Sequence, residues 1–290
     1  MTAVAPSRPR PGFLARTWSR IKLLKESPVG MVGLFLVVFW IAVAILAPLI
    51  SPHDPNESNM DALTDPSPTA VNWLGTDNQG RDILSRIIWG SRTVLAVAPV
   101  AVLVAYTIGC FFGLLAGYYR GWVDQVINRI ADVVLSFPAI VLYIIVIMRL
   151  GPSAFNIVMA VVFVASPQII RIVRGMTLEL REQDYVAAAK MRGESAFYIM
   201  LAEILPNARG PLIVDACLRM GYTTITIGVL GFLGLGLPPP DPDWGGMVKD
   251  TYAMMTIYPM MSLFPALAIS SLVVGFSLLA DGIREISLRD

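Results

Sequence analysis

Charged residues are scarce in this sequence. They make up 15% of its 290 residues, whereas hydrophobic residues make up 56%. A soluble domain carries about 25% charged residues. The net charge is +1, so no general attraction to nucleic acid or to acidic substrates is expected. This composition excludes an ordinary soluble domain and predicts an all-α, polytopic membrane protein.

Cysteine and histidine are nearly absent. Cys110 and Cys217 both lie within apolar segments, which indicates small buried side chains and not a disulfide or metal site. His53, the only histidine, lies beside proline and aspartate, so a solvated loop position is favoured over a metal ligand. The sequence also has no Walker motif, no glycine-rich phosphate loop and no nucleophile–base set. We therefore expect a non-catalytic chain that binds no cofactor itself.

Long apolar runs supply six candidate membrane helices. The first run, residues 29–50, would form a helix about 33 Å long at about 1.5 Å per residue, enough to cross a bilayer. The other runs cover residues 93–116, 130–148, 154–170, 211–232 and 261–280. Pro138 is expected to kink the third helix, and Pro167 to break the fourth near its end. A short turn is expected at residues 118–128.

Basic residues set the expected orientation. Residues 1–28 carry a cluster of arginine and lysine with a single acid, and a second basic cluster surrounds residues 184–206. The positive-inside rule places both clusters, and both chain termini, in the cytoplasm. We expect a basic N-terminal segment that can lie on membrane lipid, a loop outside at residues 51–92, a five-helix core at residues 93–283 and a cytoplasmic tail at residues 284–290.

The second half of the outside loop is dense in glycine, aspartate and arginine. Its polar set is Gly75, Asp77, Gly80, Arg81, Asp82 and Arg86. These residue types predict a tight turn held by side-chain hydrogen bonds and ion pairs. They could also contact a substrate, but we favour the structural role. A helix from residue 82 to residue 89 is expected to follow the turn.

Small residues and large aromatic residues mark expected packing positions. Gly109, Gly113 and Gly117 recur every fourth residue, which predicts a helix face that a neighbouring helix can approach closely. Trp244 and Tyr252 lie in the last loop outside and are expected to anchor it at the membrane interface.

A polar island separates the fourth and fifth apolar runs. Asp184 is a candidate N-cap for a short alanine-rich helix at residues 185–191. Gly193 suits the left-handed position that ends such a helix. Ser195 can cap a second short helix, which is expected to end near Pro206. The island, called the elbow below, is predicted to form helix, glycine turn and helix at the cytoplasmic mouth of the bundle.

The elbow resembles the EAA loop of ATP-binding-cassette (ABC) importer permeases. The matching residues are Tyr185, Ala188, Ala189, Gly193, Leu205 and Pro206. In that family this loop is the coupling helix that docks on an ATPase subunit, so the resemblance implies the same role here. Ala187 replaces the family's first acidic residue, and Glu203 stands where an apolar residue is common. No salt bridge from the missing carboxylate is expected.

Two further stretches resemble one subfamily of these permeases. The run from Leu74 to Arg92, and the Phe232–Gly236 sequence with Trp244 following, are similar to C-type permeases for dipeptides, oligopeptides and nickel. The resemblance covers about residues 20–286. It implies the six-helix, type I importer architecture in a bacterial cytoplasmic membrane. It also implies a second, B-type permease as heterodimer partner, two cytoplasmic ATPases that use ATP and Mg, and an extracytoplasmic binding protein that delivers peptides.

Polar residues inside the apolar runs leave two questions open. Asp215 and Arg219 lie four residues apart and face the same way, and Thr223 follows one turn later. Because charges in a membrane are costly, the pair could hold helices together or could line a translocation path. The rival function is an ion- or proton-coupled secondary transporter. Its candidate ion sites would be Asp215 and Asp132, of which Asp132 is otherwise expected to pair with Arg129.

Overall fold

The computed structural model describes residues 27–63 and 65–287. Predictions for the basic N-terminal segment and the last residues of the tail therefore lie outside the described residues. The described chain forms helices and two isolated β-bridges, Ser58–Arg81 and Thr76–Asp82. The longer helices are α2 (Pro28–Ile50), α3 (Ile83–Tyr119), α4 (Gly121–Leu135), α5 (Ala139–Leu150), α6 (Ala154–Leu180), α7 (Asp184–Met191), α9 (Leu205–Phe232), α10 (Trp244–Thr251) and α11 (Met260–Ser287).

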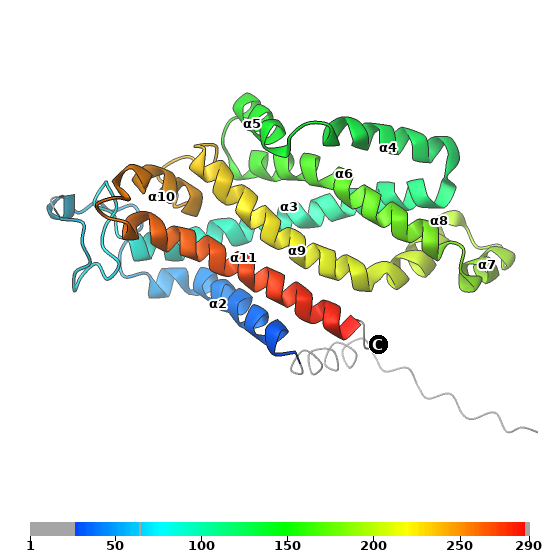
Figure 1. The fold of residues 1–290 in the computed structure, drawn as a ribbon, viewed down its shortest axis with the longest axis horizontal. Coiled ribbons are helices and arrows are strands. Elements are labelled where there is room, and N and C mark those ends of the chain that lie inside the picture. The colour runs from blue at the N-terminus through cyan, green and yellow to red at the C-terminus, as the bar shows by residue number, and fades with distance from the viewer. Residues whose placement is uncertain (1–26, 64, 288–290) are drawn as a thin grey trace, which may run out of the picture.

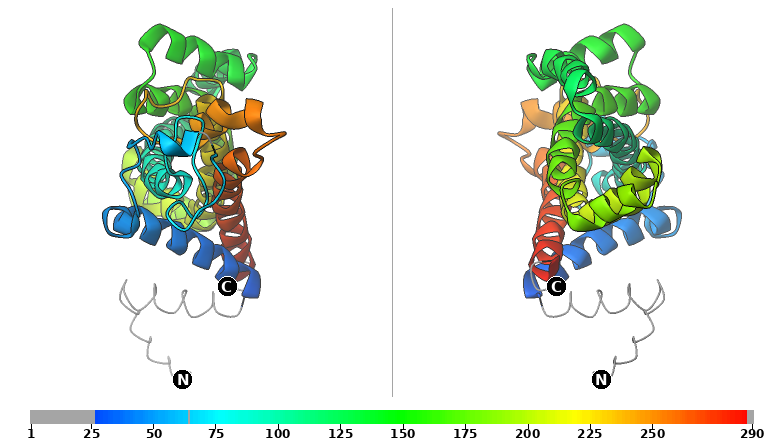
Figure 2. Two further views of the ribbon diagram at one scale, coloured as in Figure 1. Left: turned by 90° about the vertical axis from the view of Figure 1, so that its left-hand side faces the viewer. Right: turned by 90° about the vertical axis from the view of Figure 1, so that its right-hand side faces the viewer.

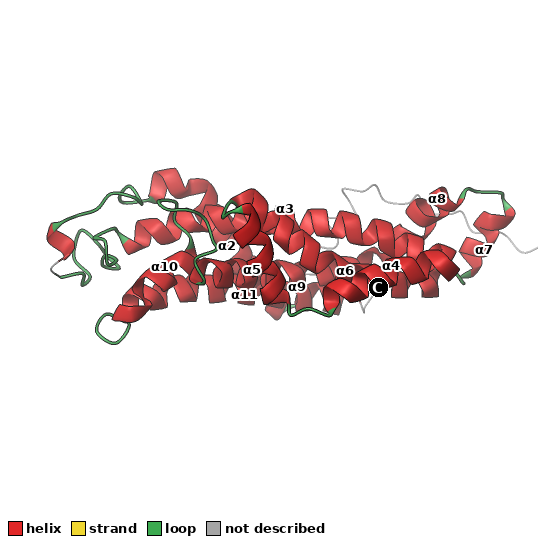
Figure 3. Ribbon diagram, turned by 90° about the horizontal axis from the view of Figure 1, so that it is seen from above, coloured by secondary structure: helices red, strands yellow, loops and turns green. Residues whose placement is uncertain are grey.

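The helices form an elongated bundle. The loop before α3 and the short helix α10 lie at one end of it, and α7 lies at the opposite end (Figures 1 and 3). Helices α4 and α5 lie on one side, and α2 with α11 on the other (Figure 2). The loop before α3 and the elbow, the two polar regions noted in the sequence, thus lie a full membrane-helix length apart.

Five helical segments among the described residues are long and apolar enough to cross a membrane. They are α2, α3, α6, the continuous segment Ala196–Phe232, and α11. Helices α4 and α5 supply a sixth span if they are counted together, but they are bent by 84° at the break between them. The kink expected at Pro138 is confirmed, because Pro138 precedes the first residue of α5. The bend is sharper than a kink within one helix.

Several predicted boundaries are wrong because helices continue through polar residues and prolines. Helix α3 begins at Ile83, so the outside helix and the second span are one 37-residue helix and the loop ends ten residues earlier than expected. The turn expected at residues 118–128 shrinks to the corner at Arg120 and Gly121, both with positive φ. The break expected at Pro167 is absent, because α6 continues through it and ends at Leu180.

The elbow also continues further than expected. A short helix, α8 (Ala196–Tyr198), is followed by the π-helical turn η2 (Ile199–Ile204) and then by α9. Pro206 is the second residue of α9 and directly follows the π-helical turn, so the change in hydrogen-bonding pattern comes where proline has no N–H to donate. The prediction that the helix ends near Pro206 is therefore wrong, because the π-helical turn passes the chain into α9 without a break.

Close packing of α3 on α6 organises the core. A Cβ atom added to Gly109 would lie 2.4 Å from Cγ2 of Ile169, and one added to Gly113 or Gly117 would meet Val173 or Thr177 as closely. The predicted glycine face is thus confirmed as a helix contact. It draws α6 against α3, and α4 and α9 each contact both of these helices.

Candidate functional site

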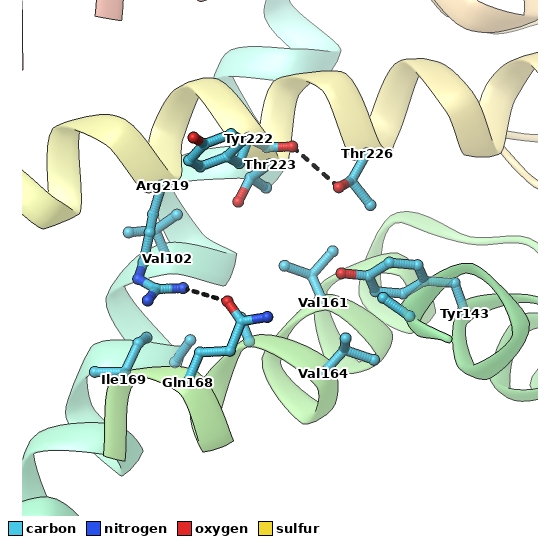
Figure 4. Close-up of a pocket in the computed structure, with 13 residues that line it drawn as sticks. Val102, Tyr143, Val161, Val164, Gln168, Ile169, Arg219, Tyr222, Thr223 and Thr226 are labelled. Atoms are coloured by element: carbon cyan, nitrogen blue, oxygen red, sulfur yellow. Dashed lines mark hydrogen bonds between the residues drawn. The ribbon is translucent and has the colours of Figure 1, made fainter. Parts of the chain in front are cut away.

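A cavity of about 310 Å³ lies between α3, α5, α6 and α9 (Figure 4). Helix α9 contributes Arg219, Thr223 and Thr226 to its lining, and α6 contributes Gln168. Apolar side chains of α3 and α6 form much of the remaining wall. The cavity thus has a polar side on α9 opposite an apolar side, near the middle of the membrane-spanning segment Ala196–Phe232.

The predicted contact between Asp215 and Arg219 is present. Nε of Arg219 lies 2.7 Å from Oδ2 of Asp215. The hydroxyl of Tyr106 on α3 also donates to Asp215, and Nη1 of Arg219 donates to Oε1 of Gln168 at 3.1 Å. Arg219 and Thr223 line the cavity, whereas Asp215 is not among the lining residues. The contacts link three helices, and Arg219 and Gln168 are the two members of the set that line the cavity.

Asp132, the other membrane acid, is placed differently from the prediction. Its carboxylate pairs with Arg171 on α6 and not with Arg129, which lies on its own helix. Both side chains of this pair are about half exposed in the described chain, at 48% and 51%. Residue spacing alone favoured the local partner, but packing of α4 beside α6 brings a distant arginine closer.

The polar set of the loop before α3 is buried. Four of its charged residues are only 4% to 6% exposed, namely Asp77, Arg81, Asp82 and Arg86. Nε of Arg81 lies 2.7 Å from Oδ2 of Asp77, and Asp82 accepts the backbone N–H of Ser85 at the start of α3. Such burial favours the structural interpretation over substrate contact, because these groups face each other inside the loop.

The two glycines of this motif explain its tight turn. Gly75 has a φ of 80° and Gly80 a φ of 74°, a region that side chains other than glycine rarely adopt. A Cβ atom at Gly80 would also lie 2.4 Å from the carbonyl oxygen of Asn59. The predicted turn is confirmed. We call the loop before α3, residues 51–82, the clasp, because Asn78 also donates to the carbonyl of Asp250 on α10.

Trp244 corrects another expectation. It is fully buried and not an interface anchor, and its indole N–H donates to the carbonyl of Ile87 at 2.9 Å. The indole lies over Gly90, where a Cβ atom would come within 2.6 Å of it. Tyr252, the second expected anchor, is exposed. The tryptophan instead fastens α10 to α3, which sequence composition could not distinguish from an interfacial position.

Asp243 is a buried acid that sequence reasoning missed. It caps α10 by accepting the backbone N–H groups of Gly245 and Gly246 at 3.3 and 3.2 Å. Burial raises the pKa of Asp243 to about 6, and the hydrogen bonds from the two glycines offset part of this rise. The available signal was an aspartate directly before Trp-Gly-Gly, which is a common N-cap pattern.

At the opposite end of the bundle, the elbow has the predicted form. Helix α7 ends before Gly193, whose φ is 78°, and Ser195 caps the next helix by accepting the N–H of Tyr198 at 3.2 Å. The N-cap of α7 is Gln183, so Asp184 is the first helical residue and not the cap. An acid there still favours the helix, because it faces the positive end of the helix dipole.

The elbow buries some of its predicted docking residues and exposes others. Ala189 is fully buried with Val186 in a cluster that includes Ile199 and Ile204. Tyr185, Ala188 and Leu205 are partly buried, whereas Gly193 and Pro206 are exposed. Met191 is 85% exposed, and sequence reasoning did not select it. The end of α7 at Met191 is therefore exposed, and the opposite face of the helix rests on the start of the long segment that becomes α9.

Tyr118 fastens the elbow to the rest of the bundle. Nζ of Lys190 on α7 lies 5.6 Å from the centre of the Tyr118 ring, and the guanidinium of Arg181 lies 5.9 Å from it. Arg181 also donates to the carbonyl of Tyr118. These cation–π contacts join the end of α3 to both sides of the turn between α6 and α7. They were not predicted, because the three residues are distant in sequence.

Two protein families match the sequence. Residues 109–289 match the family described as "Binding-protein-dependent transport system inner membrane component". Residues 13–68 match the family described as "N-terminal TM domain of oligopeptide transport permease C". The first match covers the last part of α3, from residue 109, and α4 to α11, and so includes the elbow and the polar side of the cavity.

Relatives with assigned names match over nearly the full length. The dipeptide transport system permease protein DppC of Alkalihalophilus pseudofirmus is 39% identical over 98% of this chain and 90% of its own length. The glutathione transport system permease protein GsiD of Pectobacterium atrosepticum is 40% identical over 92% of this chain and 88% of its own. The DppC protein of Haemophilus influenzae is 36% identical over 90% of each chain. The chain thus belongs to the family of binding-protein-dependent transport system inner membrane components.

Proposed function

We propose that this chain forms, together with a second, B-type permease, the path along which an ABC importer moves peptides across the bacterial cytoplasmic membrane. The names of its relatives, dipeptide and glutathione transport permeases, support a peptide substrate. A binding protein delivers the peptide on the outside, and two cytoplasmic ATPases hydrolyse ATP with Mg. The chain itself catalyses no reaction and binds no cofactor.

One observation carries this proposal: a continuous helical segment connects the elbow to the cavity. The segment begins at Ala196, packs under α7 through Ile199 and Ile204, and places Arg219 and Thr223 in the cavity wall. Movement of α7 by a partner is thereby transmitted to the cavity lining, because a helix moves nearly as one body. This is the mechanical requirement for alternating access driven from outside the chain.

The ATPases are proposed to dock on the exposed side of the elbow. Met191 and Phe197 are 85% and 62% exposed there, beside Gly193. An apolar tip at the end of a mostly polar segment is suited to a protein groove. Tyr185 and Ala188, partly buried, flank this surface, and Ala189 supports it from below. The orientation with both termini and the elbow in the cytoplasm follows from the positive-inside rule.

The test is reconstitution of the complex. The chain would be purified with the second permease and both ATPases, placed in liposomes, and assayed for ATP hydrolysis and uptake with a peptide-loaded binding protein. Hydrolysis stimulated by the loaded binding protein, with ATP-dependent uptake, is expected. A chain that transports peptide alone, driven by a proton gradient, would establish the secondary transporter instead, with Asp215 and Asp132 as its first candidate sites.

A further inference from the structure

The placement of Arg219 indicates what the cavity binds, and we propose that it holds the carboxylate terminus of a peptide in transit. This inference rests on the proposed function, since a peptide reaches the cavity only along a transport path. Among the described lining residues, Arg219 carries the one charge. An arginine in the middle of a membrane helix is costly, and where it faces a cavity it is normally a functional residue.

The guanidinium of Arg219 has more N–H donors than its protein partners accept. Its Nε donates to Asp215 at 2.7 Å, and Nη1 donates to the side-chain amide oxygen of Gln168 at 3.1 Å. Arginine has five N–H donors in a planar fork, and these two bonds use two of them, so the side chain that lines the cavity beside Gln168 has further donors to offer a ligand (Figure 4). Gln168 supplies a neutral acceptor at a position where a carboxylate oxygen would make a stronger, charge-assisted hydrogen bond.

The pairing with Asp215 explains how such a site can release its ligand. Asp215 neutralises Arg219 in the empty cavity, and the Tyr106 hydroxyl holds Asp215 from the opposite side. An incoming carboxylate therefore competes with an existing partner and with Gln168, which lowers its affinity. Weak binding suits a transport path, because a ligand must enter favourably and still leave.

The rest of the cavity fits a peptide with variable side chains. Its volume of about 310 Å³ is near the lower limit of roughly 300–1,000 Å³ for small-molecule sites, which suits a short peptide or the end of a longer one. The walls opposite Arg219 are apolar, formed by residues such as Val161 and Val164 (Figure 4). Apolar walls discriminate weakly among side chains, so the carboxylate that all free peptides share is the group this site can recognise.

The experiment compares a peptide acid with its amide. Uptake of the dipeptide Ala-Ala and of its C-terminal amide would be measured in liposomes that contain the complete complex, for the unchanged chain, Arg219→Gln and Gln168→Leu. The quantity is the ratio of kcat/KM for acid to that for amide. Any preference of the binding protein is the same in every variant, so it cancels when the ratios are compared. Arg171→Gln is the control, because it removes an exposed arginine of α6 that does not line the cavity.

The acid-to-amide ratio should change in opposite directions in Arg219→Gln and Gln168→Leu. Arg219→Gln should lower the acid-to-amide ratio at least about tenfold, which corresponds to about 1.4 kcal/mol. Gln168→Leu should raise it, because the competing acceptor is gone while the contact with Asp215 remains. Arg171→Gln should leave it unchanged. Absence of ATP-dependent uptake by the unchanged complex would overturn the proposed function itself.

The carboxylate site alone would be overturned by another result. That result is ATP-dependent uptake with the same acid-to-amide ratio in Arg219→Gln, Gln168→Leu and the unchanged complex. If Arg219→Gln leaves Asp215 unpaired and fails to assemble, Gln168→Leu decides, since Gln168 is exposed and its replacement leaves the contact between Arg219 and Asp215 in place. An unchanged or lowered ratio in that variant would refute the proposal.

Discussion

Removal of Asp215 should destabilise the chain more than removal of Asp215 and Arg219 together. In Asp215→Ala, Arg219 loses its 2.7 Å partner and keeps only neutral neighbours, among them Gln168 and Tyr106, at a position where its side chain is 12% exposed. Breaking a fully buried ion pair from one side costs about 3–5 kcal/mol, because an uncompensated charge remains, and this part-buried pair should cost less than that. The double variant Asp215→Ala/Arg219→Ala removes that charge, and we expect it to cost about 1–2 kcal/mol less than the single variant.

The assay is thermal unfolding of the purified complex in detergent. Tyr106→Phe serves as a reference, because it removes one hydrogen bond to Asp215 and leaves the ion pair, at a cost of about 1 kcal/mol. The expected order of melting temperatures is therefore Tyr106→Phe highest, then the double variant, then Asp215→Ala. A double variant less stable than Asp215→Ala would refute the reasoning, since the two residues would then contribute independently.

Three further predictions test the elbow, the clasp and α10. Gly193→Pro should abolish uptake but leave membrane insertion intact, because proline cannot adopt the φ of 78° at the elbow, and normal uptake would contradict the coupling role. Gly80→Ala should lower the melting temperature more than Gly121→Ala, since both have positive φ but only Gly80 would bring its Cβ within 2.4 Å of Asn59; equal losses would contradict the steric argument. Burial raises the pKa of Asp243 from 3.8 to about 6. Between about pH 4 and about pH 6, Asp243 therefore ionises more readily in the unfolded chain than in the folded protein. The unchanged protein should lose stability as the pH rises through this range. Asp243→Asn should flatten that part of a melting-temperature profile, and a slope that persists there would assign it to other groups.

Local features were predicted well because they depend on neighbouring residues. The elbow needed only Gly193 and the cap at Ser195, and both have the expected geometry. The contact between Asp215 and Arg219 follows from helical spacing, and the glycine face of α3 follows from its period of four. Each of these patterns is complete within about one or two helical turns, so no knowledge of distant contacts was required.

Features that depend on distant partners were missed. The helix at residues 82–89 was predicted, but its continuation through Gly90, Ser91 and Arg92 into the second span was not. Trp244 is buried only because Gly90, far along the chain, leaves room for its ring. Asp132 pairs with Arg171 because α4 lies beside α6. The position and partner that a residue type usually takes can change when the residue packs against distant segments, and that packing is set by the whole bundle.

The sequence by itself determined the class of molecule, its membrane helices, the glycine turn of the elbow and the resemblance to ABC importer permeases. Hydrophobic length and short-range spacing were sufficient for these. Only the tertiary structure decided that the elbow and the cavity share one helical segment, and that Arg219 faces a cavity while Asp215 is turned toward Tyr106. Residues four apart lie on the same helix face, so the sequence cannot distinguish the role of Asp215 from that of Arg219. The roles differ because α3 places Tyr106 against Asp215, whereas α6 places Gln168 against Arg219.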